Sequence, residues 1–163
     1  MNKIIFLDID GVLNSKHDYL RNKVMIKLYN QIYEYGIEYE FKRRLLDINL
    51  YKLELLKKIV YETNAKIVIT SEWKHLDIYP LIEDYLINKG LPIVGTTSDF
   101  GPNRGKEIKD FLIKNKIDSF VIINDNVSVY LQELENYLVK TDYCGNGLDE
   151  EHVEEAVKIL NRI

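Results

Sequence analysis

The sequence has only one cysteine, Cys144, and three prolines among its 163 residues. A single cysteine cannot form an internal disulfide, which indicates a reducing compartment, and we expect the cytoplasm. No apolar run approaches the length of about 20 residues that a membrane-spanning helix needs. The apolar residues that precede Asp8 and Asp10 are too few for a secretory signal peptide. We therefore expect a cytoplasmic protein that is neither secreted nor embedded in a membrane.

An excess of positive charge is absent as well. The 22 Lys and Arg residues are outnumbered by 26 Asp and Glu residues, which gives a net charge of −4. A global basic field for gripping nucleic acid is therefore missing, apart from a short basic cluster at 42–44. Apolar residues make up 46% of the chain and charged residues 29%, as in ordinary globular proteins. The length fits a single domain over residues 1–163.

Short apolar runs alternate with segments of helical period along the chain. Continuous apolar runs are typical of strands buried on both faces, and they occur at 3–8, 66–70 and 120–123. Weaker candidate strands lie at 92–94 and 138–140. Helical periodicity is found at 50–60, 78–86, 108–112 and 153–160. This alternation predicts an α/β fold with a mainly parallel sheet and helices on both faces.

Residues at about 15–45 interrupt this alternation, between the first strand and the helix before the second. They contain a helical period over 25–33, followed by aromatic side chains beside the basic cluster at 42–44. In one interpretation they form a peripheral helix whose aromatic side chains cover the core while the cations stay solvated. In the other they form a small helical, cap-like insert that shapes the mouth of an active site.

Polar side chains close the first apolar run, where parallel sheets bind ligands. In an open parallel sheet the ligand site lies beyond the carboxyl ends of the strands. Asp8 and Asp10 are two residues apart, so in extended backbone both side chains point toward one site. Two close carboxylates repel each other, which favours a bound cation or a raised pKa on one of them. Gly11 permits a tight turn directly after the strand.

The segment MNKIIFLDIDGVLN resembles the first motif of the haloacid dehalogenase-like (HAD) phosphohydrolase superfamily. Later segments of the chain are similar to the later segments of that superfamily and follow in the expected order: LLDINLYKLELLKKIVYETNAKIVITSEWK, GLPIVG, NRGKEIKDFL, FVIINDN and GLDEEHVEEAVKIL. The whole pattern is most similar to the small HAD domains associated with "Swiss Army Knife" RNA-repair proteins. The resemblance implies a HAD-like Rossmannoid fold and a phosphatase that requires Mg²⁺.

The same resemblance implies roles for the residues at the first two strand ends. Asp8 would attack phosphorus and form an aspartyl-phosphate. Asp10 would protonate the leaving oxygen and then activate the water that hydrolyses the intermediate. Thr70 would hydrogen-bond the phosphoryl group, with Ser71 as the fallback. Mg²⁺ would bridge Asp8 and the substrate, with the carbonyl oxygen of Asp10 in its coordination shell.

A cation is expected beside the phosphoryl group, where most of the superfamily has a lysine. In the segment NRGKEI the resemblance aligns Arg104 with that lysine, and Lys106 is the second choice. Arginine can fulfil this role because its planar guanidinium binds phosphate with two parallel hydrogen bonds. We also assign Gly11, Ser71 and Lys74 to substrate binding.

The apolar run at 120–123 ends differently from the superfamily, which usually has paired acids there. The segment FVIINDN places Asn124 at the first acid and Asp125 at the second. An asparagine brings an oxygen but no charge to Mg²⁺. If the alignment slips by one residue, Asp125 is the direct ligand. The predicted metal ligands are therefore Asp8, Asp10, Asn124 and Asp125.

Together these assignments predict a Mg²⁺-dependent phosphomonoester hydrolase. Its substrate would be a phosphorylated small molecule or a phosphorylated nucleic-acid end. An alternative is a catalytically weak or inactive HAD domain that binds a phosphorylated ligand or a partner without turnover. A third interpretation is a phosphoacceptor receiver domain. The order of the motifs disfavours it, because the D-x-D sequence closes the first strand and the acid-poor segment closes a later one.

Overall fold

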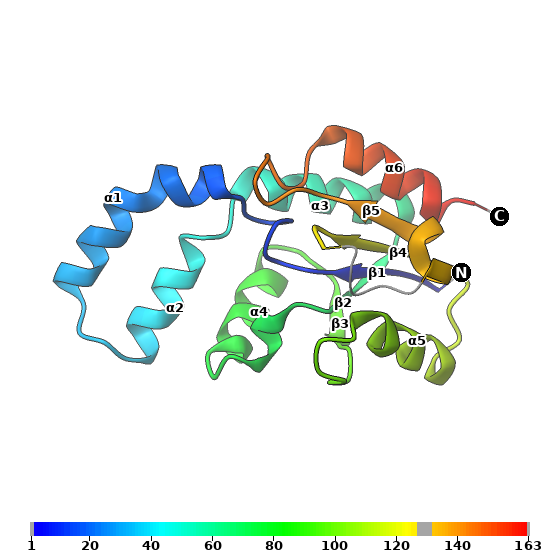
Figure 1. Cartoon of the computed structure of the whole chain (residues 1–163), viewed down its shortest axis with the longest axis horizontal. Coiled ribbons are helices and arrows are strands. Elements are labelled where there is room, and N and C mark those ends of the chain that lie inside the picture. The colour runs from blue at the N-terminus through cyan, green and yellow to red at the C-terminus, as the bar shows by residue number, and fades with distance from the viewer. Residues whose placement is uncertain (1, 127–131, 163) are drawn as a thin grey trace.

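The computed structural model describes residues 2–126 and 132–162, which form a layered fold around a sheet of five parallel strands (Figure 1). The strands are β1 (Lys3–Leu7), β2 (Lys66–Ile69), β3 (Ile93–Thr96), β4 (Ser119–Asn124) and β5 (Leu138–Lys140). Their order across the sheet is β3-β2-β1-β4-β5. The central strand is therefore β1, and the chain crosses from one side of it to the other between β3 and β4.

Helices connect the strands. They are α1 (Lys16–Ile32), α2 (Ile37–Leu45), α3 (Leu50–Thr63), α4 (Tyr79–Asn88), α5 (Arg104–Lys114) and α6 (Glu150–Leu160), with short 3₁₀ helices η1 (Glu72–His75) and η2 (Gln132–Tyr137). Polar side chains cap several of them. The Asn49 side chain accepts hydrogen bonds at the start of α3, and Asp149 does so at the start of α6. Such caps satisfy backbone N–H groups that have no partner within the helix.

Both faces of the sheet are covered, because the strands are apolar on both sides. In β1, Ile5 and Leu7 join the larger core cluster, to which α3 and α6 contribute. Ile4 and Phe6 point to the other face and pack with Ile108 of α5. Figure 1 shows α3 and α6 on one side of the sheet and α5 on the other. The predicted α/β class, with a parallel sheet between helices, is confirmed.

The register of the strands aligns their carboxyl ends. Leu7 pairs with Ile69 of β2 and with Ile123 of β4. The residues that follow these three are Asp8, Thr70 and Asn124. Because the strands are parallel, these three residues lie side by side at one edge of the sheet. This edge includes the gap between β1 and β4, where the strand order reverses and where open α/β sheets bind their ligands.

The insert between β1 and α3 consists of α1 and α2, which project beyond the end of the sheet where the strands finish (Figure 1). The Ser15 side chain caps α1, and the Asn22 amide donates a hydrogen bond to the Leu46 carbonyl. Phe41 and Leu45 of α2 pack against the larger core cluster. Every helix in the described parts of the chain is too short or too polar to span a membrane.

Candidate active site

Asp8 is held in a fixed orientation at the end of the central strand. The backbone N–H of Ile9 donates to Oδ1 at 2.7 Å, and the Asn124 amide donates to Oδ2 at 2.9 Å. Burial raises the pKa of Asp8 to about 6, although the Ile9 N–H, the Ser71 hydroxyl and the charge of Arg104 act in the opposite direction. The carboxylate is therefore oriented by its neighbours. Their hydrogen bonds and the charge of Arg104 offset only part of the cost of burying its negative charge.

Asp10 faces the same edge with a different set of partners. The Asn14 amide donates to Oδ1 at 2.8 Å, and the Trp73 indole N–H donates to Oδ2 at 2.9 Å. Asn14 is itself held by the backbone N–H of Gly11 at 2.9 Å. Asp10 is exposed, so solvent or a substrate can reach it. A carboxyl group that is both oriented and accessible is suited to exchanging protons with a substrate.

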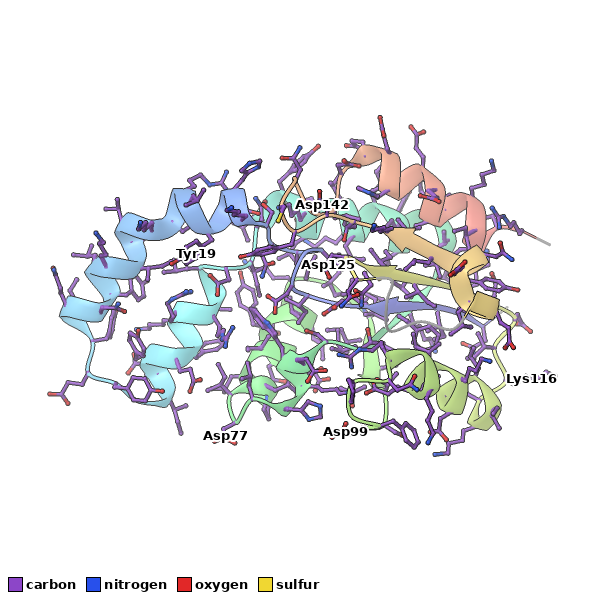
Figure 2. The ribbon with its side chains drawn as sticks, viewed as in Figure 1. Tyr19, Asp77, Asp99, Lys116, Asp125 and Asp142 are labelled. Carbon is purple, nitrogen blue, oxygen red and sulfur yellow. The ribbon has the colours of Figure 1, made fainter. Side chains whose placement is uncertain are left out.

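Gly11 allows the two acidic loops to approach each other closely. Its φ of +74° lies in the left-handed region that glycine tolerates best. A Cβ atom at this position would lie 2.4 Å from the Asp125 side chain. Burial raises the pKa of Asp125, and the negative charges of Asp10 and Asp142 raise it further. Figure 2 shows Asp125 and Asp142 at this end of the sheet.

Two hydroxyl groups follow β2. Thr70 is fully buried, and its Oγ1 has no hydrogen-bond partner within the part of the chain that the structure describes. The Thr70 backbone N–H donates to the carbonyl of Leu7, which places this residue directly beside Asp8. The Ser71 hydroxyl accepts a hydrogen bond from the backbone N–H of Trp73 at 3.3 Å and interacts with the Asp8 carboxylate. A buried, unpartnered hydroxyl is unfavourable on its own and is suited to a ligand that would satisfy it.

Arg104 is the cation whose charge acts on Asp8. It is buried at the start of α5 and donates to Glu107 at 2.9 Å and to Glu72 at 2.5 Å. Lys106 is exposed and lies over the ring of Phe100, 4.6 Å from its centroid. The structure therefore brings the charge of Arg104 to bear on Asp8 and leaves Lys106 on the surface.

Glu107 accepts hydrogen bonds from a second buried cation, Lys74, as well as from Arg104. Lys74 donates to its Oε2 at 2.8 Å, and the Thr97 hydroxyl donates at 2.7 Å. Burial alone would raise the pKa of Glu107, but these donors and the charge of Arg104 together lower it. Lys74, which we assigned to substrate binding, is thus engaged by a buried carboxylate. Its side chain is 4% exposed.

A cavity of about 460 Å³ lies between this edge of the sheet and the insert. Tyr19 reaches it from α1 and Asp125 from the end of β4 (Figure 2). Its lining comes from the motif loop, the insert and the loop after β5: Asp10, Asn14, Ser15, Tyr19, Arg43, Arg44, Asp47, Asp125 and Tyr143. Side chains of the insert therefore lie beside the predicted acid, Asp10.

Several residues of this site were not anticipated from the sequence. Trp73 is buried as tryptophans often are, and its indole N–H also orients Asp10. Asn14 stands in the segment DIDGVLN without an assigned role, although an asparagine just after a D-x-D-G turn could have been considered. Glu107, which holds Arg104, could have been found from its spacing, because it follows Arg104 by three residues on a helix. Glu72, the other partner of Arg104, had no signal, because isolated glutamates are usually solvated.

The oxygen ligands suit a hard divalent cation. Asp8, Asp125 and the amide of Asn124 lie at the ends of the two adjacent strands β1 and β4. The described residues contain no cluster of three or more Asp, Glu, His or Cys side chains that could hold a metal. Mg²⁺ usually takes one or two carboxylates together with water and substrate oxygens, and Asp8 and Asp125 are two carboxylates at these strand ends. The Asn124 Oδ1 accepts the N–H of Asn126 at 2.8 Å, and its amide group donates to Asp8, so both ends of this side chain are engaged.

Residues 4–153 match the family model described as the HAD domain in Swiss Army Knife RNA repair proteins, which confirms the resemblance of the motifs. No curated protein and no solved structure matches the chain.

Proposed function

The chain belongs to this family of HAD domains, and we propose that it hydrolyses phosphomonoesters with Mg²⁺ through a phosphorylated Asp8. Membership of the family indicates a phosphohydrolase. One observation carries the proposal. The oriented carboxylate of Asp8 lies beside the buried, unpartnered hydroxyl of Thr70, at the point where the strand order reverses. A transferring phosphoryl group there would receive both a nucleophile and a hydrogen-bond donor.

The side chains divide the chemistry between them. Asp8 attacks phosphorus, with Ile9 and Asn124 holding its two oxygens in place. Asp10, oriented by Trp73 and Asn14, gives a proton to the leaving oxygen and later accepts one from the attacking water. Arg104 balances negative charge on the phosphoryl oxygens.

Asp8, Asp125 and the backbone carbonyl of Asp10 would hold the Mg²⁺. When bound, this ion would neutralise charge on the phosphoryl group. In this proposal Asn124 acts as a hydrogen-bond donor to Asp8 rather than as a ligand, since both ends of its amide are already engaged. Asp125 then takes the role of the direct acidic ligand, as expected if the alignment is shifted by one residue.

The family description points to RNA repair, so we propose phosphorylated nucleic-acid ends as the first substrates to test, with phosphorylated small molecules as the second class. The insert would act as a small cap, since its side chains line the cavity beside Asp10. We place this activity in the cytoplasm, because the chain has a single cysteine.

The proposal is tested by turnover with and without Mg²⁺ on oligonucleotides phosphorylated at the 3′ or 5′ end, nucleotides and sugar phosphates. Asp8→Asn removes the attacking charge and should lower turnover by about a thousandfold or more. Mass spectrometry should find phosphate on Asp8 of the unmodified protein. Asp77→Asn, a change at an exposed aspartate, is the matched control. Asp8→Asn retaining about a tenth of the activity or more would contradict the covalent route.

A second candidate function rests on Asn124. This residue stands where the superfamily usually has an acid, and it brings no charge to the metal site. A domain that binds a phosphorylated ligand without hydrolysing it would show saturable binding but no phosphate release with any of these substrates. That result would favour the binding function over the enzyme.

A further inference from the structure

One arginine of the cavity has a guanidinium that no carboxylate neutralises. Arg44, on α2, lines the cavity, and no acidic side chain in residues 2–126 or 132–162 lies within ion-pair distance of it. Its neighbour Arg43 lines the same cavity but donates to Asp47 at 2.7 Å. Of these two insert cations, Arg44 is therefore the one whose charge remains available to a ligand.

Arg44 is linked to the proposed acid through a single ring. Its guanidinium carbon lies 5.1 Å from the centroid of the Trp73 ring, and the indole N–H of Trp73 donates to Asp10. Trp73 is only 2% exposed, so the ring is fixed from both sides. The attraction between this cation and the face of the ring holds the guanidinium beside Trp73, and its N–H groups can donate to a ligand.

The position of Arg44 separates it from the phosphoryl site. Arg104, the cation that acts on Asp8, does not line the cavity, whereas Asp10 does. Asp10 is the residue that would protonate the leaving oxygen. The cavity beyond Asp10 is therefore the place where the leaving group would lie, and Arg44 would meet that group rather than the transferring phosphoryl.

We propose that Arg44 forms an anion subsite for the leaving group, so that the protein prefers phosphomonoesters whose leaving group carries a second phosphate. This inference rests on the proposed phosphatase function, which fixes the direction in which the leaving group points. A cavity of about 460 Å³ is large enough for a sugar phosphate or a nucleotide unit. The arginine fork matches the geometry of phosphate oxygens.

The other charges of the cavity agree with this assignment. Asp47 is neutralised by Arg43, and Asp125 is a ligand for Mg²⁺ in the proposed function. The hydroxyl groups of Tyr19 and Tyr143 add neutral donors to the lining. A second phosphate near Arg44 would therefore meet one unpaired cation and two uncharged donors, while the carboxylate of Asp10 lies at the edge of the Trp73 ring and is held there by the indole N–H.

Calorimetric titration without added metal tests the subsite independently of turnover. One pair of ligands is fructose 6-phosphate and fructose 1,6-bisphosphate. The other pair is adenosine 5′-monophosphate and a 5′-phosphorylated adenosine dinucleotide. In at least one pair the ligand with the additional phosphate should bind about tenfold more tightly. The pair that shows the preference identifies the second phosphate as a sugar phosphate or a nucleic-acid phosphodiester.

The Arg44→Gln variant should remove this preference, and Arg44→Lys should keep part of it, because lysine retains the charge without the fork. Arg162→Gln, at an exposed arginine remote from the cavity, is the matched control. The emission of Trp73, the only tryptophan, should respond to the preferred ligand in the unmodified protein. Equal affinities within both pairs of the unmodified protein would overturn the subsite, as would a preference that survives in Arg44→Gln. Absence of turnover together with an Arg44-dependent preference would instead refute the enzyme and retain the subsite.

Discussion

Arg104 is placed by two carboxylates rather than by the nucleophile that it is proposed to assist. Glu107 and Glu72 each accept one of its N–H groups, and Glu107 also binds Lys74. A guanidinium has five N–H donors, so two ion pairs fix its plane and still leave donors for a phosphoryl group. The surface position of Lys106 offers no such fixation. The two cations should therefore differ sharply in their effect on catalysis.

Arg104→Ala should reduce kcat/KM for a phosphomonoester by about a hundredfold or more, because it removes a charged partner of the transferring group. Lys106→Ala should change kcat/KM by less than about threefold, since an exposed cation over an aromatic ring contributes little. Both variants are measured with one substrate, and thermal unfolding checks that each still folds. The reverse ranking would assign the phosphoryl contact to Lys106.

At the scale of elements, a buried ion pair joins the insert to the core. Asp18 of α1 accepts hydrogen bonds from Lys52 of α3, from the Ser15 hydroxyl, and from Asn49 at 2.6 Å. The side chains of Asp18 and Lys52 are 5% and 6% exposed. Burial alone would raise the pKa of Asp18, but the hydrogen bonds from Lys52, Asn49 and Ser15 outweigh it and lower the pKa. The junction of the insert is therefore sensitive to acid.

Asp18 should stabilise the fold in a pH-dependent way. Because its pKa is lower in the folded chain, its contribution is complete above the unfolded value of about 3.9 and is lost as the pH falls through the folded value. Asp18→Asn should therefore lower the free energy of unfolding at neutral pH by about 3 kcal/mol, because Lys52 is left without its buried partner. The difference from the unmodified protein should shrink below about pH 4. Urea unfolding at several pH values measures it, and a constant difference would contradict the role of the ion pair.

The elements themselves were largely predictable, and the contacts between them were not. Continuous apolar runs identified the strands, and the D-x-D-G motif predicted a site at the end of β1. The hydrogen bond from Trp73 to Asp10 joins residues far apart in sequence, so no local sequence pattern predicts it. Glu107 is paired with Arg104 one turn earlier on α5 and with Lys74 of η1, and the contact with Lys74 joins segments that are far apart in sequence. The sequence shows Arg44 only as one member of a basic cluster. The two arginines differ because Arg43 is paired with Asp47, and this pair forms only once the chain is folded here.

At the scale of the whole molecule, the two halves of the site differ in how firmly they are packed. Asp8 follows the central strand, whose Ile5 and Leu7 are fully buried. Within α1, all of which the structure describes, Asp18 is the only buried residue. Regions with few buried contacts open locally, whereas central strands open only when the whole domain unfolds. The proposed nucleophile thus follows a well-packed strand, whereas the proposed leaving-group side is lined partly by a helix with few buried residues.

Hydrogen exchange should separate these two regions. Backbone amides of β1 should exchange only through global unfolding, whereas amides in the middle of α1 should exchange at least about a hundredfold faster through local opening. Peptide-level mass spectrometry of exchange measures both in one experiment. Amides of α6, which packs Val153 and Ala156 into the core, provide an internal reference for a well-packed helix. Protection of α1 equal to that of α6 would contradict this difference in packing.

The two ends of the insert meet at the point where the chain leaves the core. The backbone N–H of Asn49 donates to the carbonyl of Leu13 at 2.8 Å, so the chain departs and returns at nearly one position. For a flexible loop closed in this way, each doubling of length costs only about 0.6 kcal/mol in closure entropy. Evolution could therefore lengthen, shorten or replace α1 and α2 while the strand register that aligns Asp8, Thr70 and Asn124 stays intact. In the proposed function, the part of the chain that selects the substrate would therefore be able to change without altering the part that carries out the reaction.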